Sequence, residues 1–330
     1  MLSKDIGVDL GTANILIYVK GEGIVLNEPS IVVIDEETKD IIAFGKEADE
    51  MIGRTPGKIK VIKPMKDGVI ADFEVVDILL ENLLKRVNIK GKISKPRMII
   101  CCPSNITEVE KQAIKEAAEK TGARKIFIEE EPKVAAIGAG LDIGKPLGNM
   151  VVDIGGGTTD IAVLSLGNIV TSASITSAGN QFDQDIIKYI KQKYKLLVGE
   201  KTAEKIKINI GTAKPKNQKE KMEVRGRDLV NGLPKTINIT SDEVEEALHD
   251  SIKKIINMIK VVLEQTPPEL SADIIERGIT LTGGGALLQN LKEKIHEELH
   301  VPVFVAESPL TCVAEGTGIL LDNINLIDRV

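Results

Sequence analysis

The chain has 330 residues, 42% of them apolar and 28% charged, a composition typical of a soluble globular protein and a length that favours two lobes over one core. Its 43 basic and 49 acidic residues give a net charge of −6, which argues against a nucleic-acid coat because such a protein needs a basic surface. With 3 cysteines and no long apolar run, the sequence excludes a disulfide scaffold and a bundle of membrane spans, and we expect a cytoplasmic protein.

Strand and helix patterns alternate along the first half of the chain, which is typical of an α/β protein. The clearest helix start is a capping box formed by Thr107 and Glu110, and Gly122 ends the same helix. In chain order we expect strands at residues 6–10, 15–19, 24–26 and 31–34, short strands and loops over 38–72, a helix at 74–86, a strand at 98–101, a helix at 107–122, a strand at 126–128 and a helix at 132–140.

The second half of the chain continues the same alternation. Its longest predicted helix begins at a capping box of Thr240 and Glu243 and ends before Pro267 and Pro268. The other elements expected here are strands at residues 150–154, 161–166, 279–281 and 301–305, helices at 183–195, 203–211 and 286–298, a final helix, and an exposed lysine-rich loop and hairpin over 214–227.

One pattern occurs twice: an apolar strand, an aspartate, a glycine turn and two further strands. It covers residues 6–26 and recurs at 151–175, with Asp9 and Asp153 at equivalent places. Two such units at similar positions in successive halves predict a duplicated lobe.

Both copies carry a glycine-containing turn directly after the first strand, DLGTAN at residues 9–14 and DIGGGTTD at 153–160. Free backbone N–H groups in such turns bind anions, and glycine lets phosphate oxygens approach without a Cβ clash. Two such hairpins facing each other would hold a polyphosphate from both sides. Asp9 and Asp153 would then hold Mg²⁺, through water, because Mg²⁺ keeps several of its own water ligands. Ordinary glycine hairpins are the alternative, which the repetition disfavours.

Other catalytic and binding motifs do not occur in the sequence. It has no Walker A loop, no GxGxxG turn after a strand, no GxSxG elbow and no CxxC pair. Its three histidines lie in helical segments far from the glycine turns, so we interpret them as surface residues. A third glycine turn, at residues 283–285, would either pack against a flat base or serve only as a strand-to-helix turn.

Further segments accompany these turns along the whole chain. They are GIVLNEPS at residues 23–30, MIGRTPG at 51–57, KPMKDGVIAD at 63–72, EEEPKVAAIGAG at 129–140, VRGRDLV at 224–230, GLPKT at 232–236, TPPEL at 266–270 and LTGGG at 281–285. Together with the two hairpins, they resemble the actin-like ATPase superfamily and, more narrowly, the MreB family of bacterial rod-shape proteins.

The resemblance implies an actin-like ATPase fold with two duplicated α/β lobes and a nucleotide cleft between them. Lobe I would comprise residues 1–146 and 310–330, with a small subdomain at about 32–72. Lobe II would comprise residues 147–309, with a small subdomain at about 181–240.

The resemblance also implies a role for residues at matching positions. ATP and Mg²⁺ are the implied ligands, with Asp9 and Asp153 for the metal. Glu131 would orient the attacking water, together with Thr158, although Glu129 and Glu130 compete with Glu131 by sequence alone. The phosphates would contact Thr12, Ala13, Asn14, Gly156, Gly157 and Thr158, and the adenosine would be framed by Glu204, Lys205, Ile206, Lys207, Gly284, Gly285, Ala286 and Leu287.

Three positions depart from the family pattern. Asp160 stands where glutamate is usual, Asn180 where aspartate is usual and Asn209 where glutamate is usual. The departure at Asn209 bears on recognition of the base or ribose, whereas none of the three changes the predicted phosphate residues.

The family resemblance predicts a cytoskeletal ATPase that assembles into paired protofilaments, organises cell-wall synthesis and lies at the inner face of the membrane. Its implied partners are further copies of itself, transmembrane rod-complex proteins and cell-wall synthesis proteins, with no nucleic acid. A small-molecule kinase would need a general base and a substrate pocket, for which we find no candidate beyond Glu131. A chaperone-type ATPase is a third function known on the same fold, and would need a peptide-binding domain.

A basic segment at residues 85–97 contains no acidic residue and predicts a contact with anionic lipid. Its apolar residues Ile89 and Ile93 would insert only shallowly, and a solvated loop is the alternative. The basic residues are Lys85, Arg86, Lys90, Lys92, Lys95 and Arg97.

Overall fold

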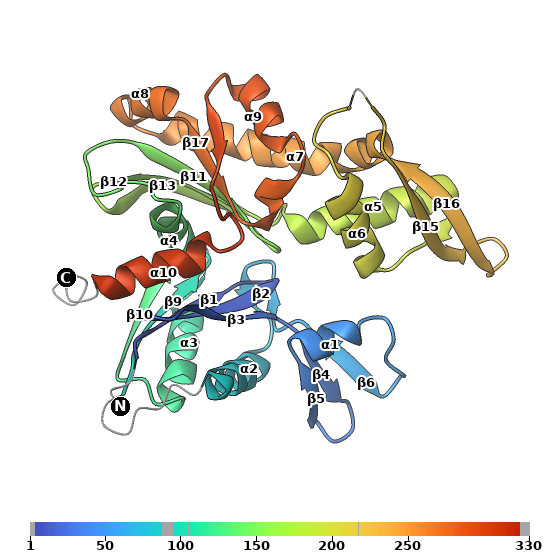
Figure 1. Cartoon of the computed structure of the whole chain (residues 1–330), viewed down its shortest axis with the longest axis horizontal. Coiled ribbons are helices and arrows are strands. Elements are labelled where there is room, and N and C mark those ends of the chain that lie inside the picture. The colour runs from blue at the N-terminus through green and yellow to red at the C-terminus, as the bar shows by residue number, and fades with distance from the viewer. Residues whose placement is uncertain (1–3, 88–94, 105, 217, 324–330) are drawn as a thin grey trace.

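The computed structural model describes residues 4–87, 95–104, 106–216 and 218–323 (Figure 1). Two five-stranded sheets form the centres of two lobes, and two three-stranded sheets extend from them. The strands of the first large sheet are β1 (Ile6–Leu10), β2 (Asn14–Val19), β3 (Gly23–Pro29), β9 (Arg97–Cys102) and β10 (Lys125–Glu130). Those of the second are β11 (Asn149–Ile154), β12 (Thr159–Ser165), β13 (Asn168–Ile175), β17 (Ile279–Thr282) and β18 (Val303–Val305).

The two large sheets have the same topology. The first has the strand order β10-β9-β1-β2-β3, and the second has the order β18-β17-β11-β12-β13. In both, the first strand in sequence lies antiparallel to the next one and parallel to the strand on its other side. The duplication predicted from the repeated strand pattern is therefore confirmed, as is the α/β fold class.

Helices cover the sheets and separate them. In Figure 1, α2 (Phe73–Arg86) and α3 (Glu108–Lys120) lie below the first sheet, and α7 (Ser241–Gln265), α8 (Pro268–Arg277) and α9 (Leu291–Leu299) lie above the second. Between the sheets lie α4 (Glu131–Gly138) and α10 (Cys312–Asp322), which pack against each other.

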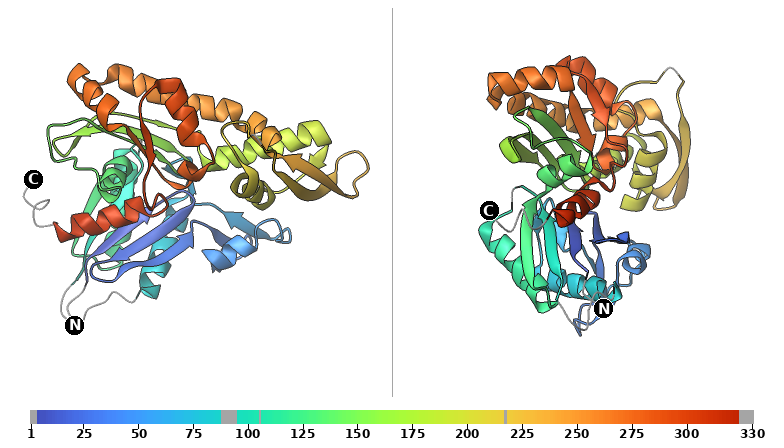
Figure 2. Two further views of the ribbon diagram at one scale, coloured as in Figure 1. Left: turned by 45° about the horizontal axis from the view of Figure 1, so that its top comes forward. Right: turned by 60° about the vertical axis from the view of Figure 1, so that its left-hand side comes forward.

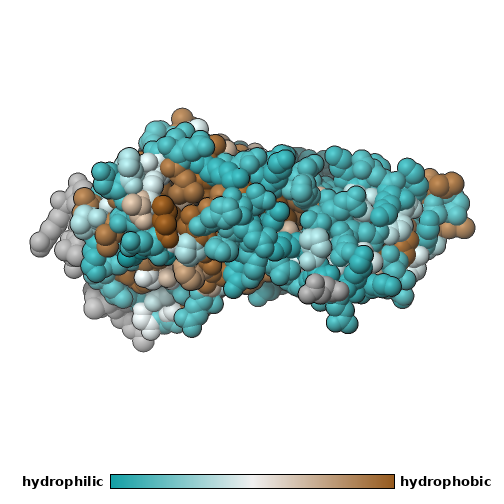
Figure 3. All heavy atoms as spheres, turned by 90° about the horizontal axis from the view of Figure 1, so that it is seen from above, coloured by the Kyte–Doolittle hydropathy of each residue, from teal (hydrophilic) through white to brown (hydrophobic). Residues whose placement is uncertain are grey.

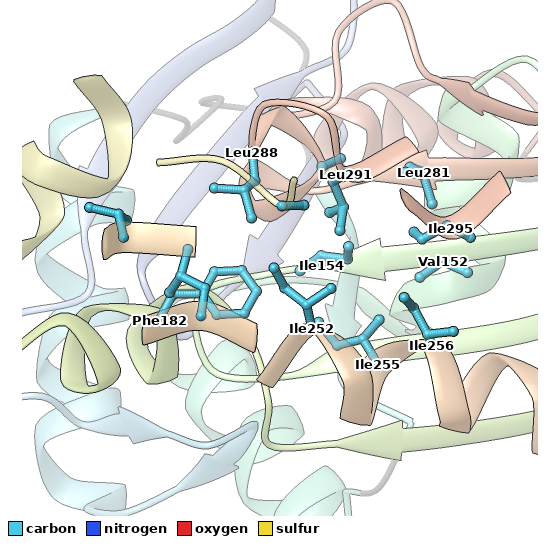
Figure 4. Packing of buried hydrophobic residues seen from close by; sticks show 14 of the residues in the cluster. Val152, Ile154, Phe182, Ile252, Ile255, Ile256, Leu281, Leu288, Leu291 and Ile295 are labelled. Carbon is cyan, nitrogen blue, oxygen red and sulfur yellow. The ribbon is translucent and has the colours of Figure 1, made fainter. Parts of the chain in front are cut away.

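Each lobe has a separate aliphatic core. In the second lobe, Phe182 and the α7 residues Ile252, Ile255 and Ile256 pack against Val152, Ile154 and Leu281 of the sheet (Figure 4). Because α7 presents apolar residues at helical spacing, its whole inner face is buried in this core.

The small sheets lie at one end of the molecule, beside each other in Figure 1. The first consists of β4 (Val32–Asp35), β5 (Ile41–Phe44) and β6 (Ile59–Ile62), and carries α1 (Lys46–Glu50). The second consists of β14 (Leu196–Leu197), β15 (Lys221–Asp228) and β16 (Pro234–Thr240), next to α5 (Gly179–Tyr194) and α6 (Glu200–Ile210). The remaining strands, β7 (Met65–Lys66) and β8 (Val69–Ile70), form a two-stranded ribbon.

Both predicted capping boxes are present. Thr107 and Glu110 exchange the two capping hydrogen bonds at the start of α3, and Thr240 and Glu243 do the same at the start of α7. A hairpin also occurs, but later in the chain than the predicted range of 214–227, because β15 begins at Lys221 and its partner β16 ends at Thr240.

The prediction of one helix over residues 286–298 was wrong. Residues Gly284–Leu287 form a short 3₁₀ helix, η1, and α9 begins only at Leu291. Between them, Gln289 forms a parallel bridge with Thr212 and accepts a hydrogen bond from the amide of Ala213 at 2.8 Å. Because the backbone of Gln289 pairs with residues 212 and 213, it does not adopt a helical conformation, and the helix predicted over 286–298 is interrupted there.

Two short helices were missed in the sequence. We interpreted Pro267 and Pro268 only as the end of α7, but Pro268 also begins α8, since proline fits the first turn of a helix. The other missed helix is α1, which is too short to show a clear helical period.

No helix in the described ranges is long and apolar enough to cross a membrane. The face seen from above is mostly hydrophilic, with hydrophobic groups in the left half of the view and at the right-hand end, which β15 and β16 form (Figure 3). The turn between these two strands exposes Leu229, Val230 and Leu233.

Candidate functional site

The two glycine hairpins face each other between the lobes. A Cβ atom added to Gly156 would lie 2.6 Å from the Cβ of Ala13, and one added to Gly157 would lie 2.7 Å from Cγ2 of Thr12. Larger residues at either glycine would therefore push the hairpins apart. The structure brings together the residues that the sequence predicted as phosphate contacts of both lobes.

Hydrogen bonds hold each hairpin in shape. In the first lobe, Ser30 donates from its hydroxyl to the carbonyl of Gly11 at 2.6 Å and from its amide to the carbonyl of Ala13 at 2.9 Å. In the second lobe, the amide of Gly155 donates to the carbonyl of Thr158 at 2.9 Å, and the amide of Asn180 donates to the carbonyl of Gly156 at 2.8 Å. The turns are thus preorganised by the segments that follow them.

Four carboxylates gather behind the hairpins. Asp9 and Asp153 lie near the ends of β1 and β11, Asp160 lies in β12 and pairs with Asp153 across the strands, and Glu131 begins α4. Burial raises the pKa of Asp9 to about 7. Burial, together with the charges of Asp160 and Asp9, raises the pKa of Asp153 to about 8.

This group of acids has the character of a cation site. Burying carboxylates near one another is unfavourable unless a positive charge compensates them. Asp9 and Asp153 therefore fit the predicted Mg²⁺ role as oxygen ligands. No group of three or more candidate ligands in the described residues is close enough to hold a metal directly, so the two aspartates would act with water and phosphate oxygens.

The structure separates the three consecutive glutamates. Glu129 pairs with Lys133 at 3.0 Å, and Glu130 is exposed at the N-cap of α4. Glu131 faces the carboxylate group: burial, and then the charges of Asp153, Asp160 and Asp9, raise its pKa well above the ordinary value. Of the three, Glu131 is the residue placed to interact with a group held between the hairpins.

A cavity of about 520 Å³ lies between the lobes beside the first hairpin. Thr12, Ala13 and Asn14 line it from the first lobe, and Asn180 and Glu204 line it from the second. Its outer walls come from the two small sheets and their helices, through residues Ile31, Asp49, Ile52, Lys63, Asp183, Glu200 and Lys201, among others.

The residues predicted to frame an adenosine on α6 have different surroundings. Glu204 and Lys205 are exposed, whereas the side chain of Ile206 lies in the core of the second lobe. Lys207 donates to the carbonyl of Gly179 at 2.9 Å and pairs with Asp183 at 2.9 Å. Burial raises the pKa of Asp183 to about 6, although the charge of Lys207 opposes this rise. Lys207 therefore connects α6 to the segment that holds the second hairpin.

The other predicted adenosine residues, Gly284 to Leu287, form η1 at the end of β17. Gly285 lies against Ile154, the last residue of β11, so η1 stands at the same edge of the sheet as the second hairpin. Ala286 is buried, whereas Leu287 is 54% exposed and able to meet a ligand.

The departures from the family pattern lie in three environments. Asp160 is buried among the carboxylates, and Asn180 lines the cavity. Asn209 is exposed and donates to the carbonyl of Lys205 in its own helix at 2.7 Å. Sequence reasoning missed Asp49, Lys63, Asp183, Glu200 and Lys201 as cavity residues, because they come from separate elements and share no motif.

Comparisons with known proteins agree on one family. The family model described as MreB/Mbl protein matches residues 3–329. The cell shape-determining protein Mbl of Bacillus subtilis (strain 168) is 60% identical over 329 residues, covering 100% of this chain and 99% of that protein. The cell shape-determining protein MreB of Escherichia coli (strain K12) is 50% identical over 331 residues, covering 99% of this chain and 95% of its own length.

A solved structure shows the same fold. The crystal structure of MreB 5 of Spiroplasma citri bound to AMPPNP superimposes with a TM-score of 0.95 at 43% identity, covering 99% of both chains. The expected actin-like fold is therefore confirmed. The match to the family model and the superposition on the solved structure both extend over essentially the whole chain. The chain therefore belongs to the MreB/Mbl family.

Proposed function

We propose that this protein is an actin-like cytoskeletal ATPase that binds Mg-ATP between its lobes, assembles into filaments and determines cell shape. The observation that carries the proposal is the meeting of two glycine hairpins over a group of buried carboxylates. The AMPPNP in the similar Spiroplasma citri structure and the cell-shape role named for Mbl support it.

In this proposal the hairpins hold the phosphates from both sides. Thr12, Ala13 and Asn14 act from the first lobe, and Gly156, Gly157 and Thr158 from the second. When bound, Mg²⁺ would neutralise phosphate charge, held through water by Asp9 and Asp153. The adenosine would lie between α6 and η1.

Hydrolysis needs a positioned water molecule more than it needs covalent chemistry from the protein. The carboxylate of Glu131 would accept a hydrogen bond from this water and align it with the terminal phosphate. Thr158, in the second hairpin, would contribute its hydroxyl to the same task. Metabolite kinase activity has no such support, since neither the family match nor the similar structure points to it.

Packing supports the proposed lobe boundaries. We assign residues 1–146 and 310–330 to lobe I, because α10 contacts α4, β1 and β2. Residues 147–309 form lobe II. The small subdomains are residues 32–72 and about 181–240, which contain the small sheets.

We propose a membrane contact that uses only part of the basic segment at residues 85–97. Residues 88–94 lie outside the described ranges, but several flanking charges are engaged within the protein. Arg97 pairs with Asp5 at 2.6 Å, Lys85 pairs with Glu81 at 2.8 Å, and Arg86 lies over the ring of Phe44. We therefore assign the contact with the inner face of the membrane to Lys90, Lys92 and Lys95, and propose rod-complex and cell-wall synthesis proteins as partners of the filament.

Electron microscopy of the purified protein on anionic lipid with Mg-ATP tests this function. We expect membrane-bound filaments and release of phosphate, both lost in Asp153→Ala. Reversing the charge of Lys90, Lys92 and Lys95 should leave the filaments intact but weaken their co-sedimentation with vesicles. A protein that stays monomeric and phosphorylates a metabolite would contradict the proposal.

A further inference from the structure

Two ion pairs cross the outer end of the interlobe cavity. Lys63 pairs with Glu200 at 2.8 Å, and Asp49 pairs with Lys201 at 2.9 Å. Asp49 lies in α1 and Lys63 directly follows β6, whereas Glu200 and Lys201 are the first two residues of α6. All four side chains line the cavity. The ribbon views show α1 and α6 opposite each other, one from each lobe (Figure 1 and Figure 2).

The charges on the two sides are reciprocal. The first lobe contributes one anion and one cation, and the second lobe contributes the opposite charges in adjacent positions. Glu200 is also held by Gln184, whose amide donates to its second carboxylate oxygen at 3.2 Å. Because α6 carries both Glu200 and Lys201, the two pairs form together when the small subdomains approach and break together when they move apart.

We propose that these two pairs form a latch that slows the exchange of nucleotide. The inference rests on the proposed nucleotide site. The inner end of the cleft is closed by the two hairpins, whose residues Gly156 and Ala13 are in contact. A ligand bound between the lobes would leave past α1 and α6, which requires both pairs to break.

The exposure of these side chains sets the size of the effect. The side chains of Lys63 and Glu200 are 41% and 46% exposed, and those of Lys201 and Asp49 are 34% and 38% exposed. Ion pairs at such sites are weak and are screened by salt, so each changes a rate by about two- to fivefold at low ionic strength. The latch would thus tune exchange without locking the nucleotide in.

The rate of release of a fluorescent ATP analogue with Mg²⁺ tests the latch. We expect Asp49→Asn and Lys63→Gln each to accelerate release by about two- to fivefold, with the acceleration fading as salt is added. Asp49→Asn is the sharper variant. It removes a negative charge that repels the polyphosphate, so it would slow release if this repulsion were its only effect, whereas loss of the latch would accelerate release. The reversed pair Asp49→Lys with Lys201→Glu should restore slow release.

A matched control is Lys58→Gln, which breaks a surface pair with Glu37 at 2.8 Å inside the same small subdomain. This control should leave the release rate unchanged. Unchanged or slower release from Asp49→Asn, or equal acceleration by the control, would overturn the latch.

A second measurement separates the latch from the proposed function. Spin labels on Glu47→Cys and Lys188→Cys, exposed positions on α1 and α5, report the distance between the subdomains without nucleotide, and the native cysteines are buried. The double variant Asp49→Asn with Lys63→Gln should shift this distance to longer values. An unchanged distance would overturn the latch. Failure of the unaltered protein to bind nucleotide would instead overturn the proposed function.

Discussion

At the scale of single residues, the proposed site is distinguished by four carboxylates, those of Asp9, Glu131, Asp153 and Asp160. Each has a pKa above its ordinary value, with burial as the main cause. Keeping such a group ionised costs free energy unless a cation compensates its charge, which is the part that Mg²⁺ would play in the proposed function.

Glu131→Gln separates binding from hydrolysis. The amide cannot align water as the carboxylate does, so we expect the rate of ATP hydrolysis to fall by about 10²- to 10⁴-fold. Affinity for Mg-ATP should persist, because the change removes one of several repelling charges. Steady-state phosphate release and nucleotide titration measure the two effects.

Glu129→Gln provides the matched control for this variant, since Glu129 is engaged with Lys133. It should hydrolyse ATP at nearly the original rate. If Glu131→Gln also retained full hydrolysis, the assignment of Glu131 to the water would be wrong.

How well the site could be predicted depended on the residue. Asp9 and Asp153 were identifiable because each follows a buried strand and precedes a glycine turn, a local pattern. The choice among Glu129, Glu130 and Glu131 required three-dimensional neighbours, because the three are adjacent and chemically alike. The partnership of Lys207 with Asp183 joins two helices, which no local pattern indicates.

At the scale of elements, the side chain of Glu243 joins the start of α7 to the end of α5. It caps α7 and also accepts hydrogen bonds from the hydroxyl of Tyr194 at 2.5 Å and from Lys193, with which it pairs at 2.9 Å. Although burial opposes ionisation, these bonds together lower the pKa of Glu243 to about 2. The ionised form therefore stabilises the folded state.

Glu243→Gln should lower the melting temperature at pH 7 by about 1–2 °C, the shift expected when a chain of this length loses about 1 kcal/mol at a helix cap. Since the folded pKa is depressed, this stabilisation is complete above the ordinary value of 4.5 and disappears as the pH falls toward 2. The difference from the unaltered protein should therefore shrink between pH 5 and pH 3. Thermal denaturation at several pH values measures it.

Glu245→Gln, a neutralisation two residues further along α7, is the control and should change little. A difference for Glu243→Gln that stayed constant from pH 7 to pH 3 would show that the carboxylate charge is not responsible.

Prediction of elements succeeded where the signal was local. The capping boxes of α3 and α7 and the period of the α7 core face are readable within a few turns of helix. The break between η1 and α9 was not predictable from a local pattern, because it depends on the bridge between Gln289 and Thr212, which are far apart in the sequence.

At the scale of the whole molecule, two sheets of identical topology enclose one site. This arrangement was predictable from the repeated strand pattern, which specifies three consecutive strands in each lobe. How close the lobes stand, with Gly156 against Ala13, was not predictable, because no sequence pattern reports a contact between two turns. The cavity mouth between α1 and α6 likewise arises only when both small subdomains are in place.

Calorimetric titration of the purified protein with ATP and Mg²⁺ tests the central claim most directly. We expect one nucleotide to bind per chain, binding to weaken when Mg²⁺ is removed, and Asp153→Ala to lose the Mg²⁺-dependent part while remaining folded by circular dichroism. The account would be contradicted if the folded protein took up no Mg-ATP, or if Asp153→Ala bound it as tightly as the unaltered chain.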